Sequence, residues 1–551
     1  MSGVVIAGGG PSGLTLAIEL GRRGVPVLLV DPKPGTAFNP QANATQARTM
    51  EHFRRLGFAH EIRAQGLPAD HPTDIAYFTR FAGHELARLR LPTAAEAVRD
   101  IRAKTGSWAV AELPHRIAQK FVEATLLRHA RALPGNELRY GSRLEDFVDH
   151  GTHVDATVRE LASGAMRVVR CRALVGADGA RSLVRSRLGI EWGGESGVRR
   201  DFMGGRMLAV YLRAPTLREA MVHPRAWMHV TVNAERRTFM CAVDGKDEFA
   251  FHAALRDDEP ADGWTDADAR RVFAQAVGIE VPVEVLSLGT WIAGHALVAQ
   301  SFRHGNVFLA GDAAHLFTPT GGLGYNTAVE DAVNLGWKLA ALVRGSAAAS
   351  LLESYEAERK PLAERNTAHA RRFADSIGLF RASAALERDD EVGRAERALA
   401  SAYLAEHARR EFDIPGVTLG GRYDRSPIIF GDGSPPPPDE ANRYVPTAKP
   451  GGRPPHAWLD DGRSLFDTFH AEWTLLALGR DAPATLGFES AAAQLGVDLR
   501  VVRHAEPALR ELYEAPLALI RPDQIVAWRG ESCDDAGAVL AHATGLSASG
   551  R

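Results

Sequence analysis

The chain begins with two short apolar runs on either side of an amphipathic stretch. Val4–Ala7 and Val25–Val30 are continuously apolar, which is typical of strands buried on both faces of a parallel sheet. Between Leu14 and Leu20 the apolar residues recur at helical spacing, and Gly24 follows as a stop signal. The pattern therefore predicts a strand–helix–strand unit at the start of the sequence.

Two later apolar runs have the same strand-like character and end in glycine–aspartate turns. Ala173–Gly176 leads into Asp178-Gly179, and Val307–Ala310 leads into Gly311-Asp312. Each turn is followed by a helix candidate. The second candidate, Thr327–Arg344, has an apolar stripe at helical spacing.

From about residue 193 to residue 285 the pattern alternates and is rich in β-formers. Met207–Arg213, Trp227–Asn233 and Arg237–Val243 predict antiparallel strands of a separate sheet. After residue 345 the composition becomes rich in Ala, Arg and Glu, which predicts helices up to about residue 411. Gly431–Pro455 is predicted to be a linker, because Ser434 is followed by a run of prolines.

The segment after this linker has the pattern of a small α/β domain. A helix is predicted near Ser490–Leu495. The strands predicted around it are Trp473–Leu478, Leu499–Arg503, Leu517–Arg521 and Gln524–Trp528.

Composition narrows the class of protein. The 551 residues are 45% hydrophobic, enough for roughly three domains with sizeable cores. A net charge of −3 gives no reason to expect nucleic-acid binding. Cys171, Cys241 and Cys533 are too few and too scattered for a disulfide framework or a zinc site, so we expect small buried thiols and no metal.

No apolar run approaches the roughly 18 residues of a membrane span, and Val4–Ala7 lacks the basic leader of a signal peptide, so we expect a cytoplasmic protein without a membrane partner.

The turn after the first strand has the spacing of a dinucleotide fingerprint. Gly8 allows a tight turn, Gly10 lets the backbone approach a pyrophosphate, and Gly13 permits close packing of helix on strand. The helix N-terminus supplies free N–H groups. Asp31, about twenty residues on, stands where a carboxylate would bind a ribose hydroxyl. A carboxylate there favours FAD or NAD over NADP.

Three signatures then occur in an order that resembles a known family. The first is the glycine fingerprint, the second is Val175–Arg185 with Asp178-Gly179, and the third begins at Gly311-Asp312. The third continues through His315, Pro319, Gly321-Gly322-x-Gly324-x-Asn326, Glu330-Asp331-Ala332-x-Asn334-Leu335 and Tyr355-Glu356-x-Glu358-Arg359-x-Pro361. Together they resemble the FAD-dependent aromatic hydroxylases, the single-component flavoprotein monooxygenases that include phenol hydroxylase and 4-hydroxybenzoate hydroxylase.

The resemblance implies which residues bind FAD. Arg48 matches the family arginine that contacts the cofactor, and Gln119 looks like a position on the adenosine side. Asp178 is implied to serve both FAD and NADPH, with helix capping at Ser182 as the alternative. His315 is expected to pack beside the flavin rather than act as a base. The implied FAD-binding residues are Gly8, Gly10, Gly13, Asp31, Arg48, Gln119, Asp178, Gly179, Gly311, Asp312, Pro319, Gly322, Leu323, Gly324 and Asn326.

The resemblance also implies a domain organisation. The FAD-binding domain is Rossmann-like and discontinuous, over residues 1–72, 101–190 and 285–400, and a substrate-binding antiparallel sheet is inserted as residues 73–100 and 191–284. Residues 401–455 complete the helices and form the linker. Residues 456–551 resemble the thioredoxin-like module of the phenol-hydroxylase branch, but Cys533 stands alone and no Cys-x-x-Cys is present, so a structural role, such as support of a homodimer, is expected.

The function implied is hydroxylation of a phenolic or polycyclic aromatic substrate with NADPH or NADH and O₂, through a flavin C4a-hydroperoxide. Epoxidation, Baeyer–Villiger insertion and oxidative decarboxylation by the same cofactor remain alternatives, as do a hydride-only flavin reductase and a non-enzymatic flavin-binding protein. No residue is assigned as the catalytic base. The residues expected to line the pocket between flavin and sheet are Tyr211, Trp227, His229, Phe239 and Met240.

Overall fold

Apolar runs from distant parts of the chain pair as parallel strands in the computed structural model, which describes residues 2–196, 204–346 and 348–546. β1 (Ser2–Ala7) lies between β2 (Val27–Asp31) and β10 (Met166–Gly176), with β7 (Asn136–Tyr140) beyond β2 and β19 (Val307–Leu309) beyond β10. The carboxyl ends of parallel strands share one edge of the sheet. The three glycine turns predicted from the sequence therefore meet at that edge.

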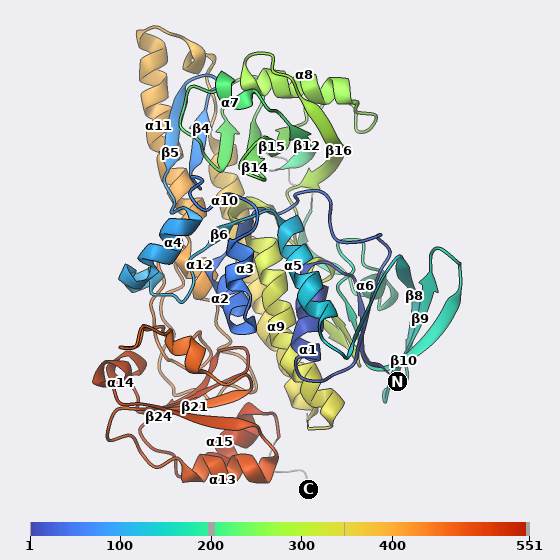
Figure 1. Cartoon of the computed structure of the whole chain (residues 1–551), viewed down its shortest axis with the longest axis vertical. Helices are drawn as coiled ribbons and strands as arrows, with labels where there is room; N and C mark the ends of the chain where they lie inside the picture. The colour runs from blue at the N-terminus through green and yellow to red at the C-terminus, as the bar shows by residue number, and fades with distance from the viewer. Residues whose placement is uncertain (1, 197–203, 347, 547–551) are drawn as a thin grey trace.

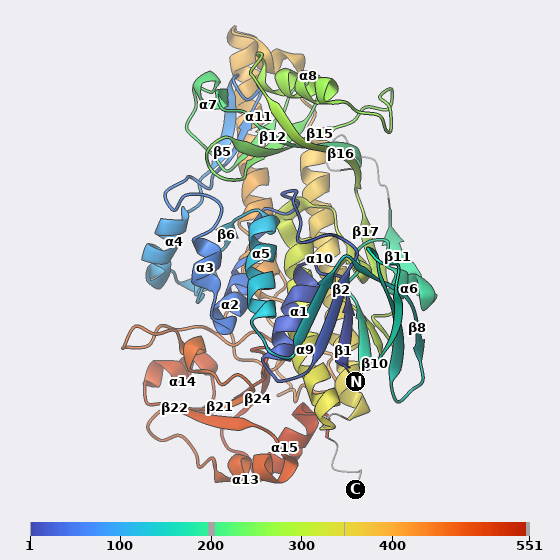
Figure 2. The same ribbon diagram turned by 45° about the vertical axis from the view of Figure 1, so that its right-hand side comes forward.

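Two of the helices pack against each other beside this sheet. α1 (Pro11–Gly21) and α9 (Leu323–Arg344) lie side by side, and α5 (Gln119–Arg131) lies on the other flank of α1 (Figures 1 and 2). Gly336 makes the α1–α9 contact close, since a Cβ there would lie 2.5 Å from the Cβ of Glu19. α9 begins four residues before the predicted start at Thr327, because Gly322 in the left-handed region already starts the helix at Leu323.

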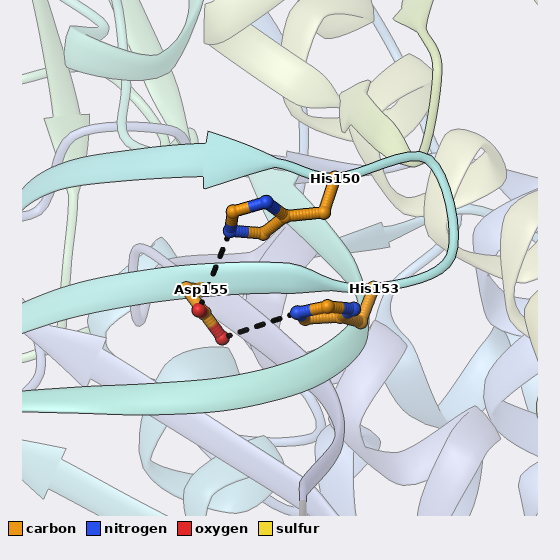
Figure 3. A group of neighbouring side chains, drawn as sticks. All are labelled: His150, His153 and Asp155. Atoms are coloured by element: carbon orange, nitrogen blue, oxygen red, sulfur yellow. Dashed lines mark ion pairs between the residues drawn. The ribbon is translucent and has the colours of Figure 1, made fainter.

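A hairpin extends the sheet past β10. β8 (Ser142–Asp149) and β9 (Val154–Glu160) pair in antiparallel register, and β9 pairs with the first half of β10. At its tip, the Nε2 atoms of His150 and His153 lie 3.4 and 3.7 Å from oxygens of Asp155 (Figure 3). Arg170 binds both oxygens of this carboxylate, at 2.9 and 3.2 Å, so the charge of Asp155 is already neutralised.

The second sheet contains the predicted strands and lies at the far end of the molecule from the C-terminal domain (Figure 1). One pair departs from the antiparallel prediction: β13 (Met228–Thr231) and β4 (Ile75–Phe78) are parallel. α8 (Asp266–Val277) covers one face, where the rings of Phe273 and Phe251 are 5.1 Å apart. The order of strands is β16 (Glu284–Ala293), β12 (Gly205–Arg213), β15 (Glu248–Ala254), β14 (Thr238–Ala242), β13 (Met228–Thr231), β4 (Ile75–Phe78) and β5 (Glu85–Leu89).

Two long helices connect the two sheets. α10 (Ala349–Leu379) and α11 (Glu391–Phe412) fill the predicted helical region, and both reach the second sheet (Figure 1). Residues 431–455 contain only isolated bridges, as their proline content predicts. The shorter elements are β3 (Ala44–Thr45), α2 (Ala47–Leu56), α3 (Ala59–Arg63), α4 (Ala94–Asp100), β6 (His115–Arg116), α6 (Leu183–Arg187), β11 (Trp192–Glu195), α7 (Leu217–Ala220), β17 (Ala296–Ala299), β18 (Arg303–His304), β20 (His315–Leu316) and α12 (Pro415–Leu419).

The C-terminal domain is a mixed four-stranded sheet with helices, as predicted. β21 (Trp473–Leu478) is parallel to β22 (Leu499–His504) and antiparallel to β23 (Leu517–Ile520), which pairs with β24 (Val526–Gly530). The helices are α13 (Leu486–Leu495), α14 (Pro507–Tyr513) and α15 (Ala536–Ala543). Cys533 is half-buried and unpaired, whereas Cys171 and Cys241 are buried thiols. No helix in the described part of the chain is long and apolar enough to span a bilayer.

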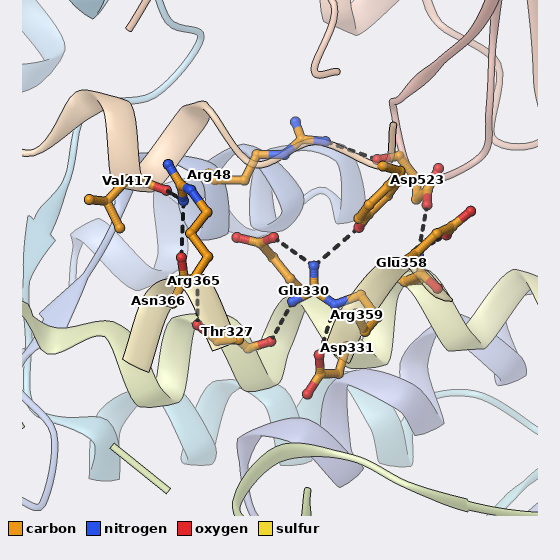
Figure 4. Close-up of polar contacts among 12 residues, drawn as sticks. Arg48, Thr327, Glu330, Asp331, Glu358, Arg359, Arg365, Asn366, Val417 and Asp523 are labelled. Carbon is orange, nitrogen blue, oxygen red and sulfur yellow. Dashed lines mark hydrogen bonds and ion pairs between the residues drawn. The ribbon is translucent and has the colours of Figure 1, made fainter. Parts of the chain in front are cut away.

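Buried ion pairs join this domain to the rest of the molecule. Arg521 donates to both oxygens of Glu358 on α10, at 2.7 and 2.8 Å, and also to Asp523. Arg453 donates to both oxygens of Glu51 on α2, at 2.5 and 2.8 Å. Figure 4 shows Glu358 and Asp523 meeting at this junction. Because both guanidinium groups are removed from water, each needs its carboxylate in place.

We predict that Arg521→Met destabilises the protein by about 3–5 kcal/mol, because Glu358 and Asp523 would both lose a buried cationic partner while Lys338 still pairs with Glu358. The free energy of unfolding in urea measures this. Arg500→Met, at an exposed position of the same domain, is the matched control. Equal effects of the two substitutions would contradict the prediction.

The Glu51–Arg453 pair predicts a loss of stability in acid. Burial alone would raise the pKa of Glu51, but Arg453 and Arg48 lower it from 4.5 to about 2. The stabilisation is therefore complete above pH 4.5 and is lost as the pH falls towards 2. We expect the difference in unfolding free energy between wild type and Glu51→Gln to shrink over this interval. A difference that is independent of pH would contradict it.

A candidate cofactor and substrate site

The glycine turn after β1 has the shape that the fingerprint predicts. Gly8 has a φ of +112°, and a Cβ on it would lie 2.0 Å from the carbonyl oxygen of Ala177. A Cβ on Gly13 would lie 2.0 Å from the carbonyl oxygen of Gly8. Gly10 differs, since its backbone is extended and nothing lies within 4 Å of the place of its Cβ. Gly8 and Gly13 are therefore required by the fold, whereas Gly10 leaves an open cradle at the start of α1.

The turns after β10 and β19 lie against this first turn. Ala177, next to Asp178-Gly179, touches Gly8 as described, and a Cβ on Gly311 would lie 3.2 Å from the Cβ of Ser12. The Ser12 hydroxyl is buried and has no hydrogen-bond partner among the described residues. Asp312 is exposed, and no described donor is within hydrogen-bonding distance of its carboxylate. The turns thus present an open glycine, an unpaired hydroxyl and an unpaired carboxylate together.

Asp31 shapes the glycine turn. Its buried carboxylate accepts hydrogen bonds from the backbone N–H of Gly9 at 2.7 Å and of Lys33 at 2.8 Å. The Tyr140 hydroxyl donates to the carbonyl of Gly9 at 3.0 Å, a contact that the sequence analysis did not predict. A ribose contact by Asp31 stays a prediction.

The predicted flavin-ring loop is held from two sides. Gly321 and Gly322 have φ values of +68° and +63°, and the Gly321 N–H donates to Glu411 of α11 at 3.0 Å. Asn326 accepts from the N–H of Gln46 at 2.8 Å and donates to the carbonyl of Ala44 at 2.9 Å. The side chain of Asn326 therefore ties the loop to β3, and its contact with the cofactor stays a prediction.

Pro319 is exposed at the start of this loop, whereas Leu323 is buried in the first turn of α9. A Cβ on Gly324 would be in ordinary contact with Phe317, at 3.5 Å. No side chain caps the N-terminus of α9. Its first N–H groups are therefore free to face a ligand.

Behind the loop, one carboxylate joins the motif segments. Asp331 accepts from the Gly311 N–H at 3.1 Å and lies 2.6 Å from Nε2 of His315. Arg359 donates to its other oxygen at 2.8 Å and extends between α9 and α10 (Figure 4). His315 and Asp331 are completely buried, so His315 is a packed residue, as expected.

Arg48 does not point to the cofactor turns. α2 begins at Ala47, and this directs the Arg48 side chain towards the C-terminal domain, where it donates to the carbonyls of Asp523 and Gln524 at 2.9 and 3.0 Å. It also pairs with Glu51 at 3.2 Å. The expected contact between Arg48 and FAD is therefore wrong. The partners of Arg48 lie more than 470 positions along the chain, which local motif matching does not reveal.

Two other predicted contacts have local partners. Asp178 accepts from the N–H of Val184 in α6 at 3.2 Å, and its second oxygen is buried without a described partner. Helix capping, the alternative for Asp178, is thus present, while one oxygen stays free. Gln119 donates to Glu123 at 2.7 Å, and Glu123 also accepts from the N–H of Ala37. This places Gln119 beside the segment that follows Asp31.

The five predicted pocket residues fall on two faces of the second sheet. His229 and Met240 are register partners and share a face with Phe251, which packs on α8. They are therefore core residues on the side away from the cofactor turns, and their assignment to the pocket is wrong. The alternation of a strand explains this, because Phe239 and Met240 must point to opposite faces.

Tyr211 and Phe239 lie on the other face, which we call the inner face. The Tyr211 hydroxyl accepts from Lys120 of α5 at 2.5 Å, and Glu248 accepts from it in turn. Trp227 lies beneath the guanidinium of Arg116, 4.8 Å from its ring centre. α5 packs on α1, which starts at the first glycine turn, and β6 pairs with β3, which Asn326 ties to the start of α9, so the inner face is turned towards the cofactor turns.

The inner face also carries residues that the sequence did not single out. Burial lowers the pKa of His252 to about 4, its ring stacks on Phe239 at 4.5 Å, and Trp291 donates to it at 3.2 Å. Tyr77 packs on His407 of α11, one turn before Glu411. In the sequence, the alternation of side chains along β15 and β4 is the pattern that could have indicated that His252 and Tyr77 lie on this face.

Comparisons with known proteins agree with this geometry. Residues 1–370 match the family described as "FAD binding domain", and residues 447–547 match "Aromatic-ring hydroxylase, C-terminal". The chain is 32% identical to tetracenomycin B2 monooxygenase-dioxygenase of Streptomyces olivaceus and 32% identical to aklavinone 12-hydroxylase RdmE of Streptomyces purpurascens. Each alignment covers 98% of this chain and 97% of the relative.

A solved structure of the rebeccamycin biosynthetic enzyme RebC with reduced flavin superposes with a TM-score of 0.88 at 35% identity, over 99% of both chains. The match spans the turns, the inner face and the C-terminal domain together. The chain therefore belongs to the FAD-dependent aromatic-ring hydroxylases, flavoprotein monooxygenases that use O₂ and a reduced nicotinamide.

Proposed function

We propose that this enzyme hydroxylates a phenolic or polycyclic aromatic molecule that lies between the Gly321–Gly322 loop and the inner face. The observation that carries this proposal is the placement of Tyr211 and Phe239 on the sheet face that is turned towards the loop, with Trp227 nearby under the guanidinium of Arg116. Flat apolar side chains there suit a flat apolar substrate.

The residues present fit FAD. Gly10 and the unpaired Ser12 hydroxyl would hold the pyrophosphate at the N-terminus of α1, and Asp312 would accept a hydrogen bond from the ribityl chain. The loop from Pro319 to Gly324 would lie against the ring. Gly8, Gly13, Gly179 and Gly311 would shape the turns around the cofactor, and Asp31 and Gln119 would lie on its adenosine side.

When bound, FAD accepts a hydride from NADPH or NADH and activates O₂, and one oxygen atom enters the aromatic ring while the other leaves as water. The chain orients the partners and excludes water. The free N–H groups of α9 would stabilise negative charge at the ring edge beside Leu323. The imidazole of His252, whose pKa burial lowers to about 4, is neutral at pH 7. The homodimer, the cytoplasmic location and the choice between NADPH and NADH stay predictions.

We predict that Gly10→Val weakens FAD binding at least tenfold while the protein still folds, because the Cβ position of residue 10 lies in open space and the added side chain would occupy the cradle. FAD fluorescence on titration of the apoprotein measures the dissociation constant. Gly289→Val, at another glycine with open space around its Cβ position and in exposed β16, is the control. Native FAD affinity in Gly10→Val would contradict the assignment.

The function is tested by NAD(P)H oxidation under ¹⁸O₂ with a panel of phenols, naphthols and hydroxyanthraquinones. We expect at least one compound to accelerate oxidation and to gain a single ¹⁸O atom. Oxidation that no aromatic compound alters, without incorporation of label, would favour the hydride-only reductase instead.

Two variants of β14 then test the pocket. Phe239→Leu should raise KM for that substrate several-fold, whereas Met240→Leu should leave it unchanged, because the two side chains lie on opposite faces. Equal KM values in the two variants would contradict the location.

A further inference from the structure

Arg116 stands between the flavin loop and the inner face. It lies in β6, where it pairs with Ala44 of β3. Ala44 in turn accepts from Asn326 at 2.9 Å, and a Cβ on Gly322 would lie 2.9 Å from the Cβ of Ala44. On its other side, the Arg116 guanidinium lies over the Trp227 ring at 4.8 Å. The residue therefore joins the two surfaces that would enclose a substrate, with its backbone on the loop side and its guanidinium on the side of the sheet.

The guanidinium of Arg116 has no anionic partner. The residue is 4% exposed, and its Nη1 is buried without a hydrogen bond. Within the described ranges, neither a carboxylate nor a carbonyl oxygen binds any of its nitrogens, and Trp227 is the contact made by its planar group. The other deeply buried arginines behave differently. Arg359, Arg453 and Arg521 each bind a carboxylate, and Arg237 donates to the carbonyl of Ile377.

The charge of Arg116 persists despite burial. Burial lowers its pKa to about 10, so the group is still protonated at neutral pH. The titratable group that faces it is the Cys241 thiol, whose pKa burial raises to about 12, so this thiol is neutral. A buried cation without a counter-ion is costly. A ligand that brings an anionic oxygen would satisfy the free nitrogens and remove this cost.

We propose that Arg116 is a specificity-determining residue that binds an anionic oxygen of the aromatic substrate, a carboxylate or a phenolate on the ring. This inference rests on the proposed function and narrows its substrate class to aromatic molecules that carry an anionic oxygen. The planar guanidinium offers two parallel N–H groups to such an oxygen pair, while Trp227 fixes the plane of the group. An anion held there would set which edge of the ring faces the Gly321–Gly322 loop.

The first test measures binding without turnover. The visible spectrum of bound FAD is titrated with hydroxybenzoic, hydroxynaphthoic and hydroxyanthraquinone carboxylic acids, each beside its methyl ester and its methyl ether. We expect at least one acid to bind tenfold more tightly than a neutralised analogue. Loss on esterification identifies the carboxylate, and loss on etherification identifies the phenolate. A panel in which no acid binds more tightly than its neutral analogues overturns the proposal.

The variants separate charge from shape. Arg116→Met should abolish the preference for the acid and leave affinity for the neutral analogue within about twofold, while Arg116→Lys should keep part of the preference. Arg131→Met, at an exposed position at the end of α5, should change neither. An Arg116→Met enzyme that keeps the preference, or that loses FAD affinity instead, overturns the proposal.

A second measurement needs no ligand. Because no internal ion pair is lost, the melting temperature of the Arg116→Met holoenzyme should fall far less than that of Arg521→Met, which loses a buried carboxylate partner. An equal fall in the two variants would show an internal partner of Arg116 and would overturn the proposal. Since neither test follows oxygen transfer, a failure here is distinguishable from a failure of the hydroxylase assay.

Discussion

The Asp331 carboxylate is the contact on which the arrangement of the cofactor turns depends. It binds the Gly311 N–H, His315 and Arg359, which belong to the turn after β19, the strand behind that turn and α10. Burial alone would favour a neutral acid, but His315 and Arg359 lower the pKa of Asp331 and keep it ionised. An ionised group in this place can hold three segments at once, because each of its oxygens accepts from a fixed donor.

Neighbouring residues of α10 serve different parts of the molecule. Arg359 binds Asp331 on the cofactor side, whereas Glu358 binds Arg521 and Lys338 on the side of the C-terminal domain. Two adjacent residues of α10 therefore link the position of the Gly311 turn to the docking of the C-terminal domain. Buried ion pairs of this kind add little net stability compared with apolar contacts, but removing one partner strongly destabilises the fold. They define one docking geometry.

The same comparison explains why Arg116 stands out. The other deeply buried arginines named above bind carboxylates or carbonyls from distant segments, so the protein itself supplies their hydrogen-bond acceptors. Arg116 has no anionic partner among the described residues, although its backbone pairs with β3 on the loop side and its guanidinium lies over Trp227 on the sheet side. A buried cation that the protein itself does not pair indicates that the ligand supplies the anionic group.

The sequence by itself determined the elements and the cofactor class. The period of apolar residues and the glycine spacing act over a few residues, so the strand–helix–strand unit, α9, the strands of the second sheet and the C-terminal domain were predictable within a few positions. The motif segments were also sufficient to name Gly8, Gly10, Gly13 and Asp312 as residues of one site, because parallel strands bring their ends to one edge.

Only the tertiary structure decided which side chains face that site. Arg48 donates to carbonyls of the C-terminal domain, and Asn326 donates to the carbonyl of Ala44 in β3. His229 and Met240 lie on the side of the second sheet that α8 covers. A shift of one residue reverses the face of a strand, and the partner of a buried charge can lie hundreds of residues away. The local sequence does not show which way a side chain faces, nor that Arg116 lacks an anionic partner. Both depend on contacts between segments that meet only in the folded chain.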